Sequence, residues 1–303
     1  MPLAIFLTDD DPGFHRFGNK IFQSLIAEKF MTILNGDVQI FGSCLEGYFK
    51  AENLGSSDVG ILEIQAMGAW VELTNHLISY ELIAEQYRTG LLKSVIVSTW
   101  GMQIETLNPF NSHLTIWLDD LLSDIVIPEV SNNDLLIHLR MGDISNDQVS
   151  HADYYPLPIS YYQKLVKERN LNPVFVGQLT NKIYVEKLRD AFPLAEFYEL
   201  DILESFKLIR QTKAVAMSIS SFCFVAAWTG RKDSTIEFPV AGLMNPNQRP
   251  DINLLPLNDS RFKFWRFPIL RRLETEGLDD FLFRLESKSL GYEPYQMQEV
   301  IKE

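Results

Sequence analysis

A histidine and an arginine stand two residues apart, at His138 and Arg140, in one of the most hydrophobic stretches of the chain, DLLIHLRMGD at 134–143. In a strand, residues two apart share a face, so both polar side chains would point one way while the leucines and isoleucine between them face the core. Gly142 and Asp143 then supply a turn. A guanidinium at the carboxyl end of a buried strand offers a permanent, forked charge for a phosphate group. The structural alternative is an Arg–Asp pair that only holds the strand end.

A serine-rich turn follows a second apolar run, in AVAMSISSFCFVAAWTG at 214–230. The pattern predicts a strand, a polar turn, and an apolar helix that starts at Ser220 or Ser221 and ends near Gly230. Hydroxyls and backbone N–H groups at a helix start form an anion site. An ordinary serine cap is the alternative.

A third polar segment, FHRFGNKIFQ at 14–23, follows the first predicted strand and opens a helix. Gly18 would let a ligand approach the backbone closely, and Asn19 can cap the helix or contact the ligand. The glycines are too few for a dinucleotide-binding fingerprint or a P-loop. A capped helix with solvated basic residues is the alternative here.

These segments need an α/β scaffold, because short β-branched or aromatic runs alternate with helical periodicity along the chain. The polar, proline-bearing segment 128–133 predicts a boundary between domains 1–132 and 133–303. A loop-rich segment, 239–260, would wrap the second domain before a final helical stretch, 270–290. We predict strands at 3–7, 38–41, 94–97, 135–140, 174–176, 197–198 and 215–218, and helices at 20–34, 70–88, 159–169, 182–191 and 202–212.

Composition and charge argue against several classes of protein. The chain has 303 residues, of which 46% are hydrophobic and 22% charged, as in a globular protein of two domains. Its net charge of -13 would repel a phosphate backbone, so we expect no nucleic-acid partner. No apolar run reaches the roughly 18 residues of a membrane span, and residues 1–7 lead into Asp9–Asp11 rather than forming a signal peptide. Cys44 and Cys223 lack metal spacing, which favours a reducing cytoplasm.

Together the three segments resemble the fucosyltransferase superfamily, and most closely the bacterial alpha-1,2-fucosyltransferases of glycosyltransferase family 11. RFGNKIFQ at 16–23 resembles their R-[LF]-G-N-Q-x-F-Q start, and HLRMGD at 138–143 resembles the H-x-R-R-x-D motif of the superfamily. SISSFCFVAAWTG at 218–230 is similar to the S-x-S-[ST]-F-x-x-W-A-A-[WY]-L segment. The order and spacing of the motifs agree with the family, although they cover a small part of the chain.

The resemblance implies a GT-B fold, in which two Rossmann-like domains face across a cleft and the C-terminal one holds GDP-fucose. It implies inverting transfer of L-fucose to a sugar hydroxyl, without a metal or other cofactor. The partners would be the nucleotide sugar and an oligosaccharide or glycan acceptor, with at most peripheral membrane association. By motif position, Arg140 would hold the diphosphate and His138 would lie against the nucleotide. The other donor-site residues implied by the motifs are Arg16, Gly18, Asn19, Ser220, Ser221 and Phe222.

Three positions depart from the family pattern. Met141 stands where most alpha-1,2 members have a second arginine, and Gln178 lies where Ser-Asp-Asp is usual. Ser205 takes the place of an aspartate that often reads the guanine edge, so the neighbouring Glu204 becomes the candidate for that contact. These departures leave two alternatives open: a transferase of the same fold that uses another nucleotide sugar, and a non-catalytic nucleotide- or glycan-binding homologue.

The general base that would take the acceptor proton is not identified by a motif. The candidates follow the His138 strand: Asp143, Asp147, His151 and Asp153. We expect Arg140 and Asp143 to be the catalytic pair. The alternative role for Asp143 is to orient the Arg140 side chain.

Two further patterns have plain interpretations. Asp9–Asp11 suggests an acidic loop rather than a metal-binding D-x-D motif, and the basic and aromatic residues of 261–267 suggest a packed segment rather than a membrane-docking one.

Overall fold

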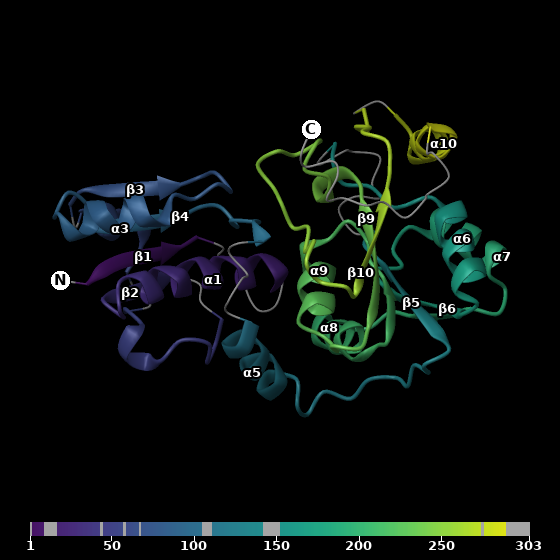
Figure 1. Cartoon of the computed structure of the whole chain (residues 1–303), viewed down its shortest axis with the longest axis horizontal. Coiled ribbons are helices and arrows are strands. Elements are labelled where there is room, and N and C mark those ends of the chain that lie inside the picture. The colour runs from purple at the N-terminus through teal and green to yellow at the C-terminus, as the bar shows by residue number, and fades with distance from the viewer. Residues whose placement is uncertain are drawn as a thin grey trace. The chain divides into compact units, whose positions relative to one another are not determined.

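The structure is a computed structural model that describes residues 2–8, 17–42, 45–56, 59–66, 68–104, 111–141, 152–273 and 276–288. The chain divides into two compact units, drawn in Figure 1. The first unit contains Met1–Ser123 and Asp251–Leu254, and the second contains Asp124–Pro250 and Leu255–Glu303. The boundary predicted at 132/133 falls within the second unit, shortly before its first strand.

The first unit is built on a sheet of parallel strands whose central members are completely buried. Its strands are β1 (Leu3–Leu7), β2 (Val38–Gly42), β3 (Trp70–Leu73) and β4 (Ser94–Val97). They lie in the order β2-β1-β4-β3. Every residue of β1 and β4 is buried, as a parallel sheet covered on both faces requires. The helical segments are α1 (Phe17–Ile33), η1 (Ala51–Asn53), α2 (Ile61–Ala66), α3 (Tyr80–Arg88) and α5 (Asn111–Leu121).

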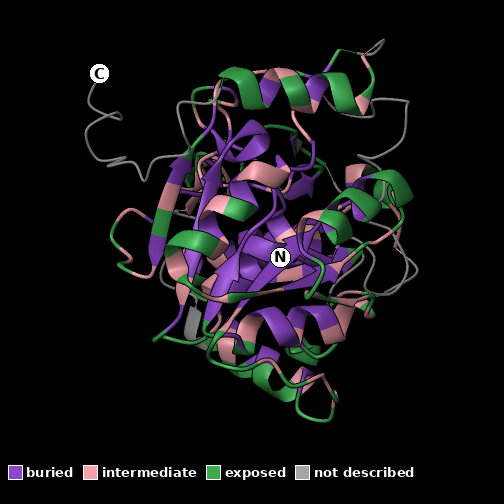
Figure 2. Ribbon diagram, turned by 90° about the vertical axis from the view of Figure 1, so that its right-hand side faces the viewer, coloured by how far each residue is buried: buried purple, intermediate pink, exposed green. Residues whose placement is uncertain are grey.

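The second unit contains a larger parallel sheet. Its strands are β5 (Asp134–Leu139), β6 (Asn172–Gly177), β7 (Glu196–Tyr198), β8 (Ala214–Ala216), β9 (Thr235–Val240) and β10 (Phe262–Arg266). The helical segments are α6 (Ile159–Arg169), α7 (Lys182–Ala191), α8 (Ile202–Gln211), α9 (Ser221–Trp228), η2 (Gly242–Met244) and α10 (Leu278–Lys288). Figure 2 shows that the buried residues concentrate in the strands and on the helix faces turned toward them.

The strand order of this second sheet is β10-β9-β8-β5-β6-β7, with all neighbours parallel. The chain therefore builds outward from β5 to β7, returns to the other side of β5 with β8, and continues outward to β10. This is the strand order of a Rossmann sheet. The order reverses between β5 and β8, and this place matters for function because open α/β sheets bind ligands there.

The predicted α/β class is confirmed, and most predicted elements are present. The predicted helix 70–88 is wrong in its first part, because 70–73 pairs with 94–97 as the edge strand β3 and the helix begins only at Tyr80. Residues 235–240 form a strand that was not predicted, so the expected loop 239–260 begins inside β9. Residues 262–266 form β10, with Phe262 and Trp265 buried, which confirms the packed segment. Among the described helices, none combines the length and the apolar character needed to span a bilayer.

Candidate functional site

The first and second polar motifs meet at the carboxyl edge of the second sheet. Strands β5 and β8 are parallel neighbours, with Ile137 opposite Ala216. Their carboxyl ends therefore lie side by side, at the point where the strand order reverses. His138 lies near the end of β5, and Ser218 follows the end of β8 by two residues. The tertiary structure thus brings together two of the three segments on which the sequence-based prediction rests.

His138 joins these two strand ends. Its Nδ1 atom lies 2.7 Å from the hydroxyl oxygen of Ser218, and the side chain is buried. Burial, with the charge of Arg140 as the second cause, lowers the pKa of His138 to about 3. The imidazole is therefore neutral near pH 7, with one ring nitrogen as a donor and the other as an acceptor.

An aromatic surface adjoins the histidine. The ring of Phe222, at the start of α9, lies 5.7 Å from the His138 ring, with 33° between their planes. The Phe206 ring of α8 meets Phe222 edge-on at 5.3 Å. Phe222 is half-buried. A half-buried aromatic residue beside polar groups suits a flat ligand such as a nucleobase or a sugar ring.

The start of α9 has the predicted serine cap. Ser220 is the N-cap residue, and its hydroxyl oxygen accepts a hydrogen bond from the Cys223 N–H at 3.4 Å. Ser221 is the first helical residue and is buried. Backbone N–H groups at a helix start point out of the helix, and the helix dipole favours an anion there. The predicted cap is confirmed, and the same geometry is that of an anion-binding site.

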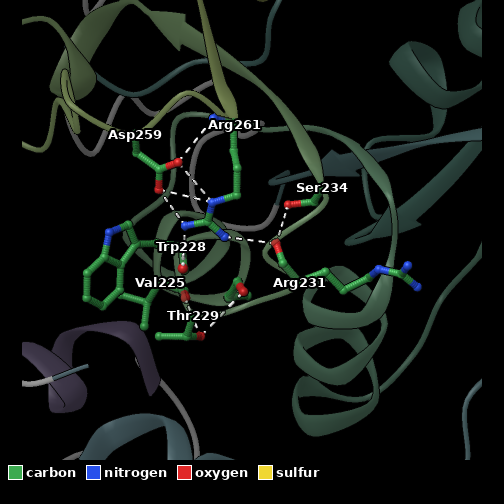
Figure 3. Close-up of polar contacts among 8 residues, drawn as sticks. Val225, Trp228, Thr229, Arg231, Ser234, Asp259 and Arg261 are labelled. Carbon is green, nitrogen blue, oxygen red and sulfur yellow. Dashed lines mark hydrogen bonds and ion pairs between the residues drawn. The ribbon is translucent and has the colours of Figure 1, made fainter. Parts of the chain in front are cut away.

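The other end of α9 is held by a polar network around Arg261, which Figure 3 shows in close-up. Its Nη2 atom donates to the Trp228 carbonyl at 2.9 Å, and Nη1 donates to the Arg231 carbonyl at 3.0 Å. The same guanidinium binds Asp259, with Nη2 and Oδ2 2.6 Å apart. A cation at the carboxyl end of a helix complements the helix dipole. Arg261 therefore helps to fix α9, whose opposite end begins at Ser221.

Arg140 follows β5 directly and is half-buried. Its guanidinium carbon lies 4.8 Å from the centre of the Tyr154 ring. Stacking on an aromatic face orients a guanidinium without neutralising its charge. The charge of Arg140 contributes to the low pKa of His138.

The position of the expected second arginine is part of the core. Met141 is completely buried, and its backbone N–H donates to Gln178 Oε1 at 3.2 Å. Gln178 comes directly after Gly177, whose φ of +123° is unfavourable for other residues. A Cβ atom on Gly177 would lie 2.2 Å from the Leu139 carbonyl oxygen. Gly177 thus permits the close approach of the β5 and β6 ends. The hydrogen bond from the Met141 main chain to the Gln178 side chain holds these ends together.

Asp153, one of the candidate bases, is engaged by three side chains. Its Oδ1 atom accepts a hydrogen bond from Gln248 Nε2 at 2.7 Å and lies 3.3 Å from Arg271 Nε. Its Oδ2 atom lies 3.7 Å from Arg249 Nη1. These partners follow β9 and β10, so the carboxylate holds three loops together. That role suits a structural anchor better than a general base.

Glu204 also has a structural partner. It is the third residue of α8 and forms a capping box with Asp201, because Glu204 Oε2 accepts the Asp201 N–H at 2.9 Å and Asp201 Oδ1 accepts the Glu204 N–H at 2.7 Å. Ser205, at the expected aspartate position, is buried. Contact of Glu204 with a nucleobase stays a prediction.

The remaining predicted residues lie elsewhere. Gly18 and Asn19 are in the first turn of α1, in the first unit, where Gly18 is buried and Asn19 half-buried. Arg16, Asp143, Asp147, His151 and Asp9–Asp11 lie outside the described residues.

Ser218 and Tyr154 are site residues that the sequence reasoning did not select. Ser218 carries a signal, because it stands two residues before Ser220 in the same polar turn. The contact of Tyr154 with Arg140 is a tertiary one, which no local pattern predicts.

Within the described ranges, no group of three or more His, Cys, Asp or Glu side chains is placed to hold a metal ion. Comparisons of the chain with protein-family models, curated proteins and solved structures found no match. The resemblance to fucosyltransferases therefore rests on the three sequence motifs.

Proposed function

We propose that this chain is a cytoplasmic glycosyltransferase that moves L-fucose from GDP-fucose to a hydroxyl group of a glycan acceptor, with inversion and without a metal. The observation that best supports the proposal is the 2.7 Å hydrogen bond between His138 and Ser218. This bond joins two motifs at the reversal of strand order. The groups near it are the neutral imidazole of His138, the ring of Phe222 at the start of α9, and the charged side chain of Arg140. A nucleotide sugar presents the complementary groups: a flat base and a diphosphate with two negative charges.

The chemistry follows from where charge appears during the reaction. The acceptor hydroxyl attacks the anomeric carbon of the donor sugar as the bond to the diphosphate oxygen breaks, so negative charge grows on the departing GDP. Fixed donors at that oxygen lower the barrier because they need no reorganisation. The guanidinium of Arg140 supplies a positive charge, and the N–H groups at the start of α9 add partial positive charge. The acceptor proton passes to a base, and GDP leaves.

The two units would bind different substrates. The second unit, with its Rossmann strand order, is the nucleotide-sugar half. The first unit, with its own parallel sheet and with Gly18 and Asn19 in α1, is the acceptor-side half of a GT-B pair. Arg140 and Asp143 stay the proposed catalytic pair.

A transferase with another nucleotide sugar is the second candidate. It is favoured by two observations at the position expected to read guanine: Glu204 already bonds within a capping box, and Ser205 is buried. The two candidates differ in the nucleobase that they bind, so nucleotide binding is the property to measure.

Thermal denaturation with GDP, GDP-fucose, UDP, ADP and CMP tests both candidates. A ligand at 100 times its Kd stabilises the fold by about 2.7 kcal/mol, which shifts the unfolding midpoint by a few degrees. We expect stabilisation by GDP and GDP-fucose, lost in Arg140→Gln and kept in Arg231→Gln, a matched change at an exposed arginine. Stabilisation by UDP, ADP or CMP instead would support the second candidate. Silence across the panel would contradict both and leave a non-catalytic homologue.

A further inference from the structure

A second polar cluster lies at the carboxyl edge of the first unit's sheet. Thr8 follows β1, His76 lies beyond the end of β3, and Thr99 and Trp100 follow β4. Gln23 of α1 donates from its side-chain amide to the carbonyls of Val97 and Thr99, at 3.0 and 3.2 Å. The strand order β2-β1-β4-β3 also reverses here, between β1 and β4. This edge therefore has the position at which an α/β sheet accepts a ligand.

His76 is the centre of the cluster, and its tautomer is determined by the backbone. His76 is buried, and its Nδ1 atom accepts a hydrogen bond from the Met102 N–H at 3.1 Å. A ring nitrogen that accepts an N–H carries a lone pair, so the proton of the neutral imidazole is on Nε2. Nε2 lies 4.0 Å from Asp251 Oδ2. The histidine thus presents a donor toward a carboxylate.

Asp251 reaches this site from the other half of the chain. The segment Asp251–Leu254 belongs to the first unit, whereas the residues on both sides of it belong to the second. Asn253 forms a parallel bridge with Gln103, and its N–H donates to the Met102 carbonyl at 3.0 Å. Gln103 Nε2 donates to the Asp251 carbonyl at 2.5 Å. These bonds hold the main chain, while the Asp251 side chain stays 34% exposed at the edge of the sheet.

An aromatic ring completes the set. Trp100 is half-buried, and its ring lies 6.1 Å from the His76 ring. A carboxylate accepts hydrogen bonds from hydroxyl groups, and an indole face packs against C–H groups. A sugar ring offers both, with hydroxyls at its edge and C–H groups on its faces. A negatively charged sugar would be repelled by the Asp251 carboxylate, so the expected ligand is neutral.

We propose that Asp251 and Trp100 bind a neutral, hydroxyl-bearing sugar ring of the acceptor, and that His76 acts as the positioning residue of the Asp251 carboxylate. The proposal rests on the proposed function, whose acceptor it describes as a neutral glycan. It also gives a reason for the return of 251–254 to the first unit, because this segment brings the Asp251 carboxylate to 4.0 Å from His76 Nε2.

The test measures glycan binding separately from nucleotide binding. The wild-type chain is applied to a printed array of neutral and sialylated oligosaccharides, and the best neutral glycan is then titrated by calorimetry. Asp251→Asn keeps the shape of the side chain and removes its charge, and we expect its affinity to fall at least about tenfold. Asp279→Asn, at an exposed aspartate of α10, is the matched control and should bind like the wild type. GDP stabilisation is measured on the same samples and should be unchanged.

Two histidine variants separate positioning from folding. His76→Gln keeps an amide donor near the Nε2 position, whereas His76→Asn keeps only a polar atom near Nδ1 for the Met102 N–H. We expect His76→Gln to retain glycan affinity and His76→Asn to lose it, although both variants stay folded by circular dichroism. Equal affinity in these two variants would contradict the positioning role.

The outcomes distinguish this inference from the proposed function. Unchanged affinity in a folded Asp251→Asn variant would overturn the sugar site. Absence of neutral-glycan binding in a wild-type chain that GDP-fucose stabilises would also overturn it, and would leave the transferase proposal standing. Glycan binding that depends on Asp251, in a chain that no nucleotide stabilises, would support the sugar site and refute the transferase.

Discussion

The Nδ1 atom of His138 lies 2.7 Å from the hydroxyl oxygen of Ser218, two residues separated by 80 positions in the chain. Because β5 and β8 are neighbours at the reversal of strand order, this hydrogen bond links the two strand ends that border the candidate site. The neutral imidazole also lies beside Phe222 at the start of α9, with 5.7 Å between the two rings.

The free energy of unfolding should depend on pH through His138. Its pKa is about 3 in the folded chain, below the ordinary value of about 6.5, so between these values the unfolded chain binds a proton that the folded chain does not. Stability should therefore rise with pH up to about 6.5, with a contribution from this residue approaching 1.4 kcal/mol per pH unit. His138→Asn keeps a polar atom near Ser218 and should lose that slope. Urea unfolding of the wild type and the variant at pH 5, 6 and 7 measures how the free energy of unfolding changes with pH. Equal slopes for the two proteins would contradict the prediction.

Loss of the Arg140 charge should lower turnover without unfolding the chain. Removing one fixed donor from a developing negative charge typically costs about 10²–10³ in kcat, so we expect that loss in Arg140→Ala. Arg140→Lys should recover only part of it, because an ammonium group lacks the planar fork that stacks on Tyr154. The measurement is the rate of GDP release from GDP-fucose with a glycan acceptor. Arg231→Ala, at an exposed arginine that pairs with Asp233, is the control, and an Arg140→Ala variant as active as this control would refute the assigned role.

An arginine at position 141 should destabilise the protein. Met141 is completely buried, so Met141→Arg would bury a charge or force the strand end apart, at a cost of several kcal/mol. Met141→Leu nearly conserves volume and should cost less than about 1.5 kcal/mol. The midpoints of urea unfolding measure both effects. Equal midpoints for the two variants would mean that the position tolerates charge and that the methionine is not required by packing.

Arg261 should stabilise α9 from its carboxyl end. Arg261→Ala removes donors from the Trp228 and Arg231 carbonyls and leaves Asp259 without its guanidinium partner, so we expect the free energy of unfolding to fall by about 1–3 kcal/mol. Although burial acts to raise the pKa of Asp259, its hydrogen bonds with Arg261 lower it below the ordinary value. The ion pair should therefore stabilise the fold near pH 7 and lose this effect as the pH falls below about 4.

Hydrogen exchange locates the effect of Arg261. The amides of α9 should exchange faster in Arg261→Ala than in the wild type, because the helix loses the network at its carboxyl end. Arg231→Ala removes an exposed side chain whose ion pair with Asp233 lies at the surface, so it should change exchange little. Faster exchange spread evenly over both units, rather than concentrated in α9, would contradict a local role for Arg261.

Much of the secondary structure was determined by the sequence alone, because hydrophobic periodicity is a local property. The predicted strands 3–7 and 94–97 and the helices 159–169 and 182–191 agree with the structure to the residue. The serine cap of α9 was also predictable, since capping depends on a residue and the N–H groups of the next turn. The chemical groups of the candidate site, a histidine, an arginine and two serines, were visible as motifs for the same reason.

The tertiary structure decided which of these groups meet. Trp70–Leu73 reads as part of a helix but becomes a strand, because pairing with the distant residues 94–97 outweighs the local pattern. The strand order that places His138 beside Ser218 depends on pairings between residues far apart in the chain, which no local period encodes. The same is true of Asp251, which reaches His76 because hydrogen bonds with residues 102–104 draw its segment into the first unit. Residue types and local spacing therefore identify the chemistry, and long-range pairing assembles the sites.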